Sequence, residues 1–471
     1  MVRPNGYADR VRGEGAGCGP STQLSTPPST PTVDAEVTSL EGEADRRFAP
    51  ARASRRLSAA LGTVPLMRLL HTSDWHLGRG LHGVDLHVAQ QQVLDQIVAM
   101  VAGRAIDVVL ICGDVFDRAV PPVSAVRLWD RTLRALCEQV PVVVIPGNHD
   151  SAPRLGVGAD LYRSGVHVVA DLDAVGTPVT LHDDHGAVRI YAVPFLDPDV
   201  ARHAWAGSSD TPLPRSHEAA MTAALTRIRS DHARRSFDVP ARTVVMAHAF
   251  VTTSTGAQPT GDGVPGSEPE RSDSERDIRV GGVDSVPVGL FDGIDYVALG
   301  HLHGAQRIGG PSDGGRVRYS GSPLRYSFSE VAQRKQVAVV DLAADGSVEV
   351  ENVELEQPRG MSTVAGPLEH LLTDPGLTEV ERCWVQVTVT DAARPTQMVA
   401  RVKERFPEAL VVRHVPSAGP LATGSPVGVP ASPLEVAESF VRHVTGGDIT
   451  SVELDVFRDA YEHVMASGRE A

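Results

Sequence analysis

Apolar runs alternate with helical periods between residues 67 and 330. The runs are rich in Val, Ile and Leu and are bounded by Gly, Pro and Asp, which is typical of strands buried on both faces. Strands are predicted at 67–72, 106–112, 141–145, 188–193, 242–247 and 294–299. Helices are predicted at 85–103, 122–139 and 217–232. The predicted fold class is therefore α/β, with a sheet layer flanked by helices.

Beyond residue 330 the predicted elements become shorter. Strands at 336–342, 348–354, 383–390 and 410–414, with a helix at 395–405, indicate a smaller α/β domain at 331–415. The Pro-, Ala- and Gly-rich stretch 416–433 is a predicted linker. Two amphipathic helices around "TGGD" follow within 434–471. This helix pair either packs on its own chain or docks on a helix of a partner.

Two polar segments interrupt this pattern. Residues 1–66 are rich in Gly, Pro, Ser and Thr, and because they bury too little apolar surface to offset their ordering entropy, we expect a disordered extension. Residues 55–67 combine basic and apolar residues as a signal peptide does, but they run straight into a core strand, so we expect no secretion. Met67 is then a candidate translation start. Residues 252–277 are predicted as a long loop with an ordered end at "SDSER".

Composition narrows the classes of function. The formal net charge of −15 has the wrong sign for a protein that coats nucleic acid by bulk electrostatics. Of the 44 Lys and Arg residues only Lys335 and Lys403 are lysines, and because the arginines are spread along the whole chain, we attribute this bias to codon usage. The four cysteines are scattered without a CxxC pair, which argues against disulfides and a thiolate zinc site and for a cytoplasmic location. No apolar run approaches a membrane span.

Polar residues follow five of the predicted buried strands. They are Asp74 and His76, Asp114 and Asp117, Asn148 with His149 and Asp150, His248, and the pair His301 and His303. Each group is a weak signal by itself, since the chain holds 18 histidines. Because open α/β sheets build their sites at the carboxyl ends of the strands, we expect all five groups to converge.

The residue types in this set favour metal-dependent hydrolysis. Neutral imidazoles, carboxylates and an amide oxygen without a thiolate suit Mn, Fe or Zn. One carboxylate shared by two such cations holds them about 3.5–4 Å apart, the spacing of two-metal hydrolases that act on phosphoryl groups. A serine hydrolase needs a positioned nucleophile, and none of the five strand ends carries a GxSxG elbow. A P-loop, GxxxxGK[ST], is absent from the sequence.

The ordered set DxH, GDxxD, GNHD, a lone His and GHxH resembles the calcineurin-like metallophosphoesterase superfamily. Within it, "LLHTSDWHLGR", "NHDSAPRLG", "SDSERDIRVGG", "YVALGHLH" and "YSGSPLRYSFSE" are similar to the SbcD family of nuclease subunits from bacterial SbcCD complexes. The resemblance is strongest between 67 and 330 and does not cover 1–66. It implies a metallophosphoesterase sandwich at 67–330, a DNA-capping domain at 331–415 and a helix pair at 434–471 that grips the coiled coil of an SbcC-type ATPase.

The resemblance also implies a role for each strand-end residue. Asp74, His76, Asp114 and His303 would hold one divalent metal ion, and Asp114, Asn148, His248 and His301 the other, with manganese as the usual metal. His149 takes the position of a catalytic imidazole that stabilises the transition state or assists the leaving 3′ oxygen. Asp117 and Asp150 are interpreted as partners that fix imidazole tautomers, with a turn or helix cap as the alternative. Candidate phosphate contacts are Arg79, Arg154 and Arg325.

The activities implied are ATP-dependent 3′-to-5′ exonuclease on double-stranded DNA and endonuclease on hairpins and single strands, in DNA end processing, repair and recombination. The expected partners are DNA, the SbcC-type ATPase and a second copy of this chain, which would make a heterotetramer. The helices at 85–103 and 122–139 could supply the interface between the two copies. Two alternatives stay open: a small-molecule phosphodiesterase or phosphatase on the same core, and a non-catalytic DNA-end scaffold. The acidic net charge predicts weak DNA binding by the isolated chain.

Overall fold

The computed structural model describes residues 67–162, 165–206, 212–235, 241–253, 272–273, 275, 285–309, 315–417, 438, 441–442 and 449–467. The chain divides into two compact units, one that ends at Pro358 and one that begins at Arg359. The extension predicted at 1–66 lies outside the described residues, as do nearly all of the predicted linker 416–433 and most of the loop predicted at 252–277.

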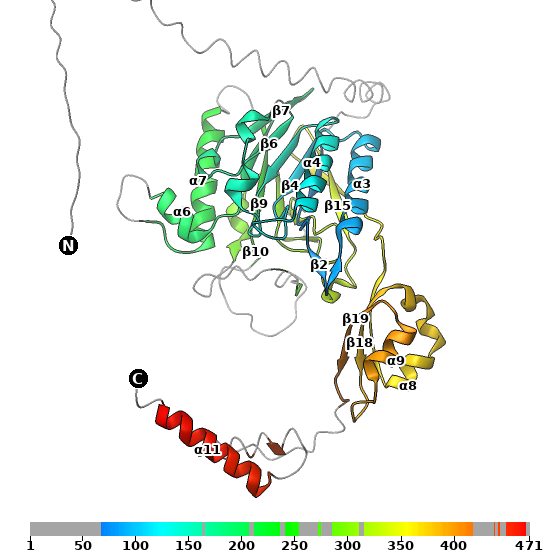
Figure 1. Cartoon of the computed structure of the whole chain (residues 1–471). Helices are drawn as coiled ribbons and strands as arrows, with labels where there is room; N and C mark the ends of the chain where they lie inside the picture. The colour runs from blue at the N-terminus through cyan, green and yellow to red at the C-terminus, as the bar shows by residue number, and fades with distance from the viewer. Residues whose placement is uncertain are drawn as a thin grey trace, which may run out of the picture. The chain divides into compact units, whose positions relative to one another are not determined.

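The first unit contains two six-stranded sheets that share a core between them (Figure 1). The first sheet has the order β16-β15-β1-β4-β5-β6 and the second β13-β14-β12-β9-β8-β7. The strands of the first are β1 (Met67–Thr72), β4 (Val108–Cys112), β5 (Val142–Ile145), β6 (Val166–Val168), β15 (Gln336–Leu342) and β16 (Val348–Glu354). Those of the second are β7 (Val179–Asp183), β8 (Gly186–Val193), β9 (Ala241–His248), β12 (Tyr296–Gly300), β13 (Gln306–Arg307) and β14 (Val317–Tyr319). The inner strands β1, β4 and β5, like β8, β9 and β12, are parallel.

Helices cover the outer faces of both sheets (Figure 1). α3 (His87–Gly103) and α4 (Val123–Cys137) pack on the first sheet, and α6 (Pro198–Ala204) and α7 (His217–Arg235) pack on the second. β4 shows why the strands are apolar throughout, because Val108 and Leu110 belong to the core between the sheets while Val109 and Ile111 belong to the core under the helices. Full burial of such a side chain contributes about 1.5–3 kcal/mol. The predicted layered α/β fold is confirmed.

Short elements fill the connections between the layers. They are the hairpin strands β2 (Gly80–Leu81) and β3 (Val84–Asp85), the parallel pair β10 (Val251–Thr252) and β11 (Val286–Pro287), the helix α5 (Ala152–Leu155), and the 3₁₀ helices η2 (Ala159–Leu161), η3 (Leu172–Ala174), η4 (Val288–Phe291) and η6 (Phe328–Glu330). The last of them, η6, lies in the connection from β14 to β15 and ends at Glu330.

The strands between residues 336 and 354 correct the predicted domain boundary at 330/331. β15 pairs antiparallel with β1, from Met67↔Leu342 to His71↔Ala338, and β16 pairs with β15. Both strands therefore extend the first sheet. β15 pairs with the backbone N–H and C=O groups on one side of β1, which would otherwise be exposed at the edge of the sheet. The second unit accordingly begins at Arg359.

The second unit contains a three-stranded parallel sheet of order β17-β18-β19. Its elements are β17 (Met361–Gly366), α8 (Leu368–Thr373), the 3₁₀ helix η7 (Pro375–Arg382), β18 (Trp384–Val389), α9 (Met398–Arg405) and β19 (Ala409–His414). A core of its own joins the sheet to α8 and α9 through residues such as Leu371, Val387 and Val402.

One helix of the predicted C-terminal pair is described, α11 (Ser451–Ser467). Its apolar side chains Val452, Val456, Phe457 and Tyr461 are exposed. Most of the other predicted helix lies outside the described residues. In the part of the chain that the structure describes, no helix is both long enough and apolar enough to cross a membrane.

His71 on β1 links the two sheets. Its Nδ1 lies 2.9 Å from Tyr296 Oη and its Nε2 lies 3.1 Å from Leu299 O, and both partners belong to β12. Because a carbonyl oxygen only accepts, Nε2 carries the proton and Nδ1 accepts from the Tyr296 hydroxyl. Complete burial lowers the pKa of His71 to about 3, so the ring stays neutral near physiological pH.

We expect His71→Gln to reduce the pH dependence of stability. The unfolded chain protonates this imidazole below pH 6.5, whereas the folded chain resists protonation down to about pH 3, so stability falls as pH drops through this window. Between about pH 5.5 and 4.5 the free energy of unfolding should change less steeply in the variant, by about 1.4 kcal/mol per pH unit. Urea unfolding at each pH measures this slope, and equal slopes for variant and wild type would contradict the prediction.

Candidate metal centre

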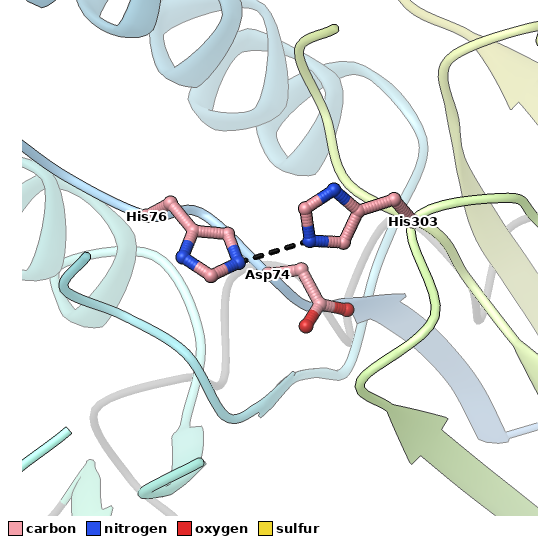
Figure 2. Close-up of side chains that lie close together, drawn as sticks. All are labelled: Asp74, His76 and His303. Carbon is pink, nitrogen blue, oxygen red and sulfur yellow. Dashed lines mark hydrogen bonds between the residues drawn. The ribbon is translucent and has the colours of Figure 1, made fainter. Parts of the chain in front are cut away.

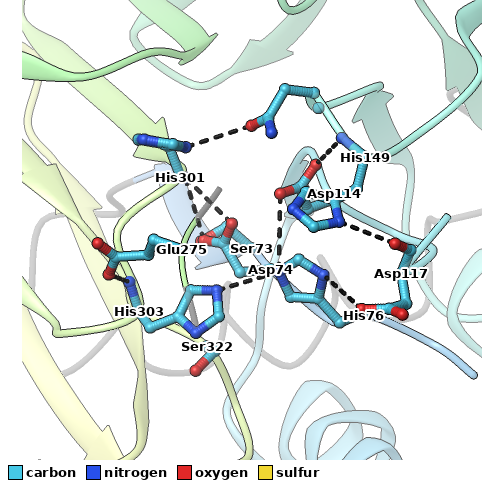
Figure 3. Close-up of polar contacts among 12 residues, drawn as sticks. Ser73, Asp74, His76, Asp114, Asp117, His149, Glu275, His301, His303 and Ser322 are labelled. Carbon is cyan, nitrogen blue, oxygen red and sulfur yellow. Dashed lines mark hydrogen bonds and ion pairs between the residues drawn. The ribbon is translucent and has the colours of Figure 1, made fainter. Parts of the chain in front are cut away.

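Five strand ends meet at one edge of the sandwich and bring the predicted polar residues together (Figure 3). β1, β4 and β5 belong to the first sheet, and β9 and β12 belong to the second. The buried members of the group are Asp74, His76, Asp114, His248, His301 and His303. Asn148 and His149 are partly buried in the loop between β5 and α5. The expected convergence of these side chains is therefore present in the structure.

The loops that leave the strands turn through strained backbone. Asp74, His76 and Asp114 have φ angles of 54°, 43° and 50°, in the left-handed region that side chains rarely adopt. Four of the seven described non-glycine residues with positive φ belong to this site, with His301 as the fourth. Each such residue costs about 1–3 kcal/mol and persists only where the surroundings enforce it.

Hydrogen bonds between the β1 and β4 loops enforce this conformation. The N–H of Asp74 donates to Gly113 O at 3.0 Å, and the N–H of His76 donates to Asp114 O at 2.9 Å. Glycine is required where the next loop approaches, because a Cβ on Gly147 would lie 2.7 Å from Asp114 Cγ. The N–H of His149 also donates to Asp114 Oδ1 at 2.8 Å. The carboxylate of Asp114 is thus fixed by the loop of β5.

Asp74, His76 and His303 form the first cluster of potential metal ligands, with one ligand atom from each within 4.8 Å of the others (Figure 2). The Nε2 atoms of the two histidines face one another at 3.0 Å. Asp114 Oδ2 lies 3.6 Å from His76 Nε2. The Tyr326 ring packs edge-on against both imidazoles, 5.5 Å from His76 and 5.8 Å from His303. These contacts set the orientation of the two rings.

Asp114, Asn148, His248 and His301 form the second cluster. Asn148 Oδ1 lies 2.9 Å from His248 Nε2 and 3.2 Å from His301 Nδ1. Asp114 Oδ2 lies 3.5 Å from His248 Nε2. Since the same oxygen lies 3.6 Å from His76 Nε2, Asp114 stands between the two clusters, where a bridging ligand is expected.

The electrostatics of the two clusters fit divalent cations. Burial raises the pKa of Asp74, and the nearby charge of Asp114 raises it further. Burial lowers the pKa values of His76, His248 and His303, so these rings offer neutral nitrogens. The Nδ1–H of His248 donates to Cys112 O at 2.9 Å, which leaves the lone pair on Nε2, among the other ligand atoms. Neutral nitrogens around two buried carboxylates make a donor set that a pair of divalent cations would satisfy.

His149 lies at the margin of the first cluster with Asp117. Its Nδ1–H donates to Asp117 O at 2.8 Å, and its ring stands edge-on to His76 at 4.6 Å. Asp117 Oδ1 lies 3.7 Å from His76 Nδ1 and 3.4 Å from Arg79 Nη1. Asp117 thus contacts His149 through its backbone carbonyl and lies near His76 through its carboxylate, and Arg79 reaches the site.

Asp150 and Arg325 both form hydrogen bonds with backbone groups, and for Asp150 this matches the alternative of a turn. The carboxylate of Asp150 accepts from the backbone N–H groups of Val115, Phe116 and Gly147, so it ties two loops together rather than fixing an imidazole. Burial, followed by the charge of Asp114, raises the pKa of Asp150 to about 7. The guanidinium of Arg325 donates to the carbonyls of Glu330 and Gln333 and so supports a turn. Arg154 is exposed and donates to Ala119 O, near the loop of Asp117.

Four residues around His303 escaped the sequence analysis, namely Glu275, Tyr326, Glu330 and Lys335. Glu330 is fully buried and lies 3.0 Å from His303 Nδ1 through its Oε1. Glu275 accepts from the His303 backbone N–H at 2.8 Å. The sequence contains a signal that could have pointed to each of them. Glu275, Tyr326 and Glu330 lie in the segments "SDSER" and "YSFSE", and Lys335 is one of only two lysines in an arginine-rich chain.

Comparison with known proteins gives a family and two weaker likenesses. The model of the calcineurin-like phosphoesterase family matches residues 67–305. The crystal structure of TT1561 from Thermus thermophilus is 16% identical with a TM-score of 0.35, over 62% of this chain and 100% of that chain. GAP50, the anchor in the inner membrane complex of Plasmodium, is 11% identical with a TM-score of 0.33, over 76% of this chain and 99% of that chain.

Adding Mn²⁺ to chelator-treated protein should raise its unfolding temperature. Each occupied site stabilises the folded chain by about 2.7 kcal/mol when free metal is about 100 times Kd. Asp114→Asn should remove most of this gain, because Asp114 stands between both clusters. Asp231→Asn is the matched control, since Asp231 is a buried carboxylate on α7 that pairs with Arg235. Calorimetry measures both variants, and equal stabilisation of Asp114→Asn and wild type would contradict the prediction.

Proposed function

The chain belongs to the calcineurin-like phosphoesterase family of metal-dependent phosphoesterases, and on this premise we propose that it is a DNA nuclease subunit of the SbcD type, with two manganese ions. The observation that carries the proposal is the position of the SbcD-like sequence segments. Ser272 and Glu275 of "SDSER" and Glu330 of "YSFSE" all lie around His303. The features that resemble SbcD beyond the general family motifs thus pack against the candidate metal centre.

We assign the ligands by cluster. Asp74, His76, Asp114 and His303 would hold one metal ion, and Asp114, Asn148, His248 and His301 would hold the other. When bound, the two cations supply Lewis acidity that lowers the pKa of water and offsets the negative charge of the phosphoryl oxygens. The chain itself excludes bulk water from the ligands, since Asp74, His76, His248 and His303 are almost completely buried.

His149 is the proposed catalytic imidazole. Its Nδ1–H is committed to Asp117 O, so proton exchange with a substrate falls to Nε2. The ring lies beside His76 and is partly exposed, where a phosphodiester can reach it. Protonated at Nε2, it would stabilise charge on the phosphoryl group or donate to the leaving 3′ oxygen. Arg79, with Arg154 as a second candidate, would contact the DNA phosphates.

The proposed partners follow from charge and exposed apolar surface. A net charge of −15 opposes DNA binding by the chain alone, so we propose that an SbcC-type ATPase supplies part of the DNA affinity. The exposed apolar side chains of α11, such as Val456 and Phe457, suit docking on a coiled coil. The described cysteines, Cys112, Cys137 and Cys383, are all thiols, which suits the proposed cytoplasmic location.

A second copy of the chain is proposed to dock on α3 and α4. Val88 near the start of α3 is exposed, as are Val120, Val123 and Val126 at and before the start of α4. Apolar residues on two neighbouring helices can form a four-helix interface with their symmetry mates. With one ATPase subunit on each copy, this gives the expected heterotetramer.

His149→Gln should lower kcat for DNA cleavage by about 10²–10⁴-fold, the usual contribution of a general acid or base. Because His149 belongs to neither proposed ligand set, Mn²⁺ binding should be unchanged. The assay uses a hairpin oligonucleotide and a 3′-labelled duplex with Mn²⁺, in the presence and absence of the SbcC-type ATPase and ATP. Full activity in the variant would overturn the catalytic assignment.

The same assay separates the alternatives to a nuclease. Rapid hydrolysis of bis(4-nitrophenyl) phosphate without cleavage of either DNA substrate would indicate a small-molecule phosphodiesterase. Binding of DNA ends in complex with the ATPase, without hydrolysis of any diester, would indicate a scaffold. Cleavage of hairpins and 3′ ends that requires Mn²⁺ supports the proposal.

Val123→Asp combined with Val126→Asp should convert a dimer to a monomer, because burying two carboxylates in an apolar interface is strongly unfavourable. Light scattering coupled to size-exclusion chromatography measures the mass in solution. Val399→Asp is the control, since Val399 is an exposed valine on α9 in the second unit. A wild-type monomer, or a double variant that stays dimeric, would contradict this interface.

A further inference from the structure

Three polar atoms of His303, its backbone N–H, its carbonyl oxygen and its Nδ1, are held by residues outside the first cluster. Its backbone N–H donates to Glu275 Oε1 at 2.8 Å, and its carbonyl accepts from Lys335 Nζ at 2.9 Å. Its Nδ1 lies 3.0 Å from Glu330 Oε1. The remaining atom, Nε2, lies 3.0 Å from His76 Nε2 (Figure 2). The orientation of the His303 ring is therefore determined by Glu275, Glu330 and Lys335, which are not among the proposed metal ligands.

Glu330 accepts hydrogen bonds at both of its oxygens. Oε1 accepts from His303 Nδ1 and from Ser272 Oγ at 3.2 Å. Oε2 accepts from the backbone N–H of Tyr326 at 3.1 Å and lies 2.7 Å from Lys335 Nζ. The Tyr326 N–H and Lys335 Nζ can only donate, so Oε2 is an acceptor, and the ion pair with Lys335 keeps the carboxylate ionised, so that Oε1 is an acceptor as well. An ionised carboxylate accepts from all four partners.

Lys335 is the buried counterion that keeps Glu330 ionised. Its ammonium also donates to Ser322 Oγ at 2.9 Å and to Gln333 Oε1 at 2.8 Å. Burial alone would raise the pKa of Glu330, but the charge of Lys335 and the hydrogen bond from His303 hold it below its ordinary value. Both side chains are almost completely buried, at 0% and 1% exposure. A buried ion pair of this kind adds little net stability, which points to a role in placing its neighbours.

An obligate acceptor at Glu330 determines the tautomer of His303. Because Glu330 Oε1 cannot donate, the proton of the neutral imidazole resides on Nδ1 and the lone pair on Nε2. Nε2 is the atom that faces His76 Nε2, and His303 belongs to the first cluster with Asp74 and His76. A histidine that kept its proton on Nε2 would point N–H at the same place and could not bind a cation there.

We propose that Glu330, held by Lys335, is a positioning residue that presents the Nε2 lone pair of His303 to the metal ion of the first cluster. The inference rests on the proposed function, in which His303 is a ligand of that ion. Glu330 acts through the ring of His303, whose Nδ1 it contacts, and the same carboxylate ties the "SDSER" segment to the site through Ser272. The second cluster lacks this dependence, because His248 is oriented by Cys112 O.

Glu330→Gln and Glu330→Asp test the proposal in the full-length chain. The glutamine carries a donor that must face either His303 and Ser272 or Lys335 and Tyr326. The aspartate keeps the charge beside Lys335, and with it the fold, but its shorter side chain withdraws the acceptor from His303. Calorimetric titration with Mn²⁺ counts the sites and measures their affinities. Two-bond ¹H–¹⁵N correlations of ¹⁵N-histidine in the metal-free protein report which nitrogen of His303 is protonated, with His303→Gln to assign the signal.

The expected result is that one of two Mn²⁺ sites weakens by about 10–100-fold, the usual effect of removing the partner of a ligating histidine, while the other is unchanged. In the wild type the proton of the neutral His303 ring should reside on Nδ1. In the variants the ring should exchange between the tautomer protonated at Nδ1 and the one protonated at Nε2. Asp231→Asn, which removes a buried carboxylate from an ion pair on α7, should change neither readout.

Two further outcomes would overturn the inference, and they differ in what else they overturn. Wild-type binding of two Mn²⁺ ions with unchanged affinities and an unchanged His303 tautomer in both Glu330 variants rejects the positioning role alone. A wild-type chain that binds no Mn²⁺ rejects the proposed function together with the inference.

Discussion

Two carboxylates that repel one another stand at the centre of this protein, those of Asp74 and Asp114. Both are buried, and burial together with the charge of Asp114 raises the pKa of Asp74. Uncompensated charge in a protein interior costs on the order of several kcal/mol. The imidazoles of His76, His248 and His303 around these carboxylates are neutral. The two negative charges of the centre therefore have no cationic partner among these imidazoles, and divalent cations bound there would offset them.

Holding such groups together requires strain that the fold must offset. The positive φ angles of Asp74, His76, Asp114 and His301 cost about 1–3 kcal/mol each. They persist because the loops after β1 and β4 bond one another through Gly113 O and Asp114 O, and because Asp150 ties the loops of β4 and β5 through three backbone amides. Asp150 thus serves the centre through the backbone, which is the helix-cap or turn role that its sequence position also allowed.

The strand ends were predictable because a buried strand followed by Asp, Asn or His is a local pattern, and parallel strands deliver such residues to one edge. Contacts between distant segments were not predictable in this way. Nothing in the sequence near Gln336 shows that β15 pairs with β1, so the domain boundary was placed too early. Arg325 illustrates the same limit. An arginine beside a motif can contact a phosphate or support a turn, and only the folded structure shows which groups its guanidinium reaches. Glu330 and Lys335 were missed because the contacts that give them a role are with His303, which lies 27 and 32 residues before them in the sequence.

The geometry of the candidate metal centre depends on the position of one sheet relative to the other. The first sheet supplies Asp74, His76, Asp114 and Asn148, and the second supplies His248, His301 and His303. A slide between the sheets would separate these two groups, since neither sheet contributes a complete cluster. His71 opposes such a slide, because it hydrogen-bonds to Tyr296 and Leu299 of the other sheet. His71 lies three residues before Asp74, and Leu299 lies two residues before His301. A neutral, buried histidine on β1 thereby couples the core between the sheets to the geometry of the ligands at their edge.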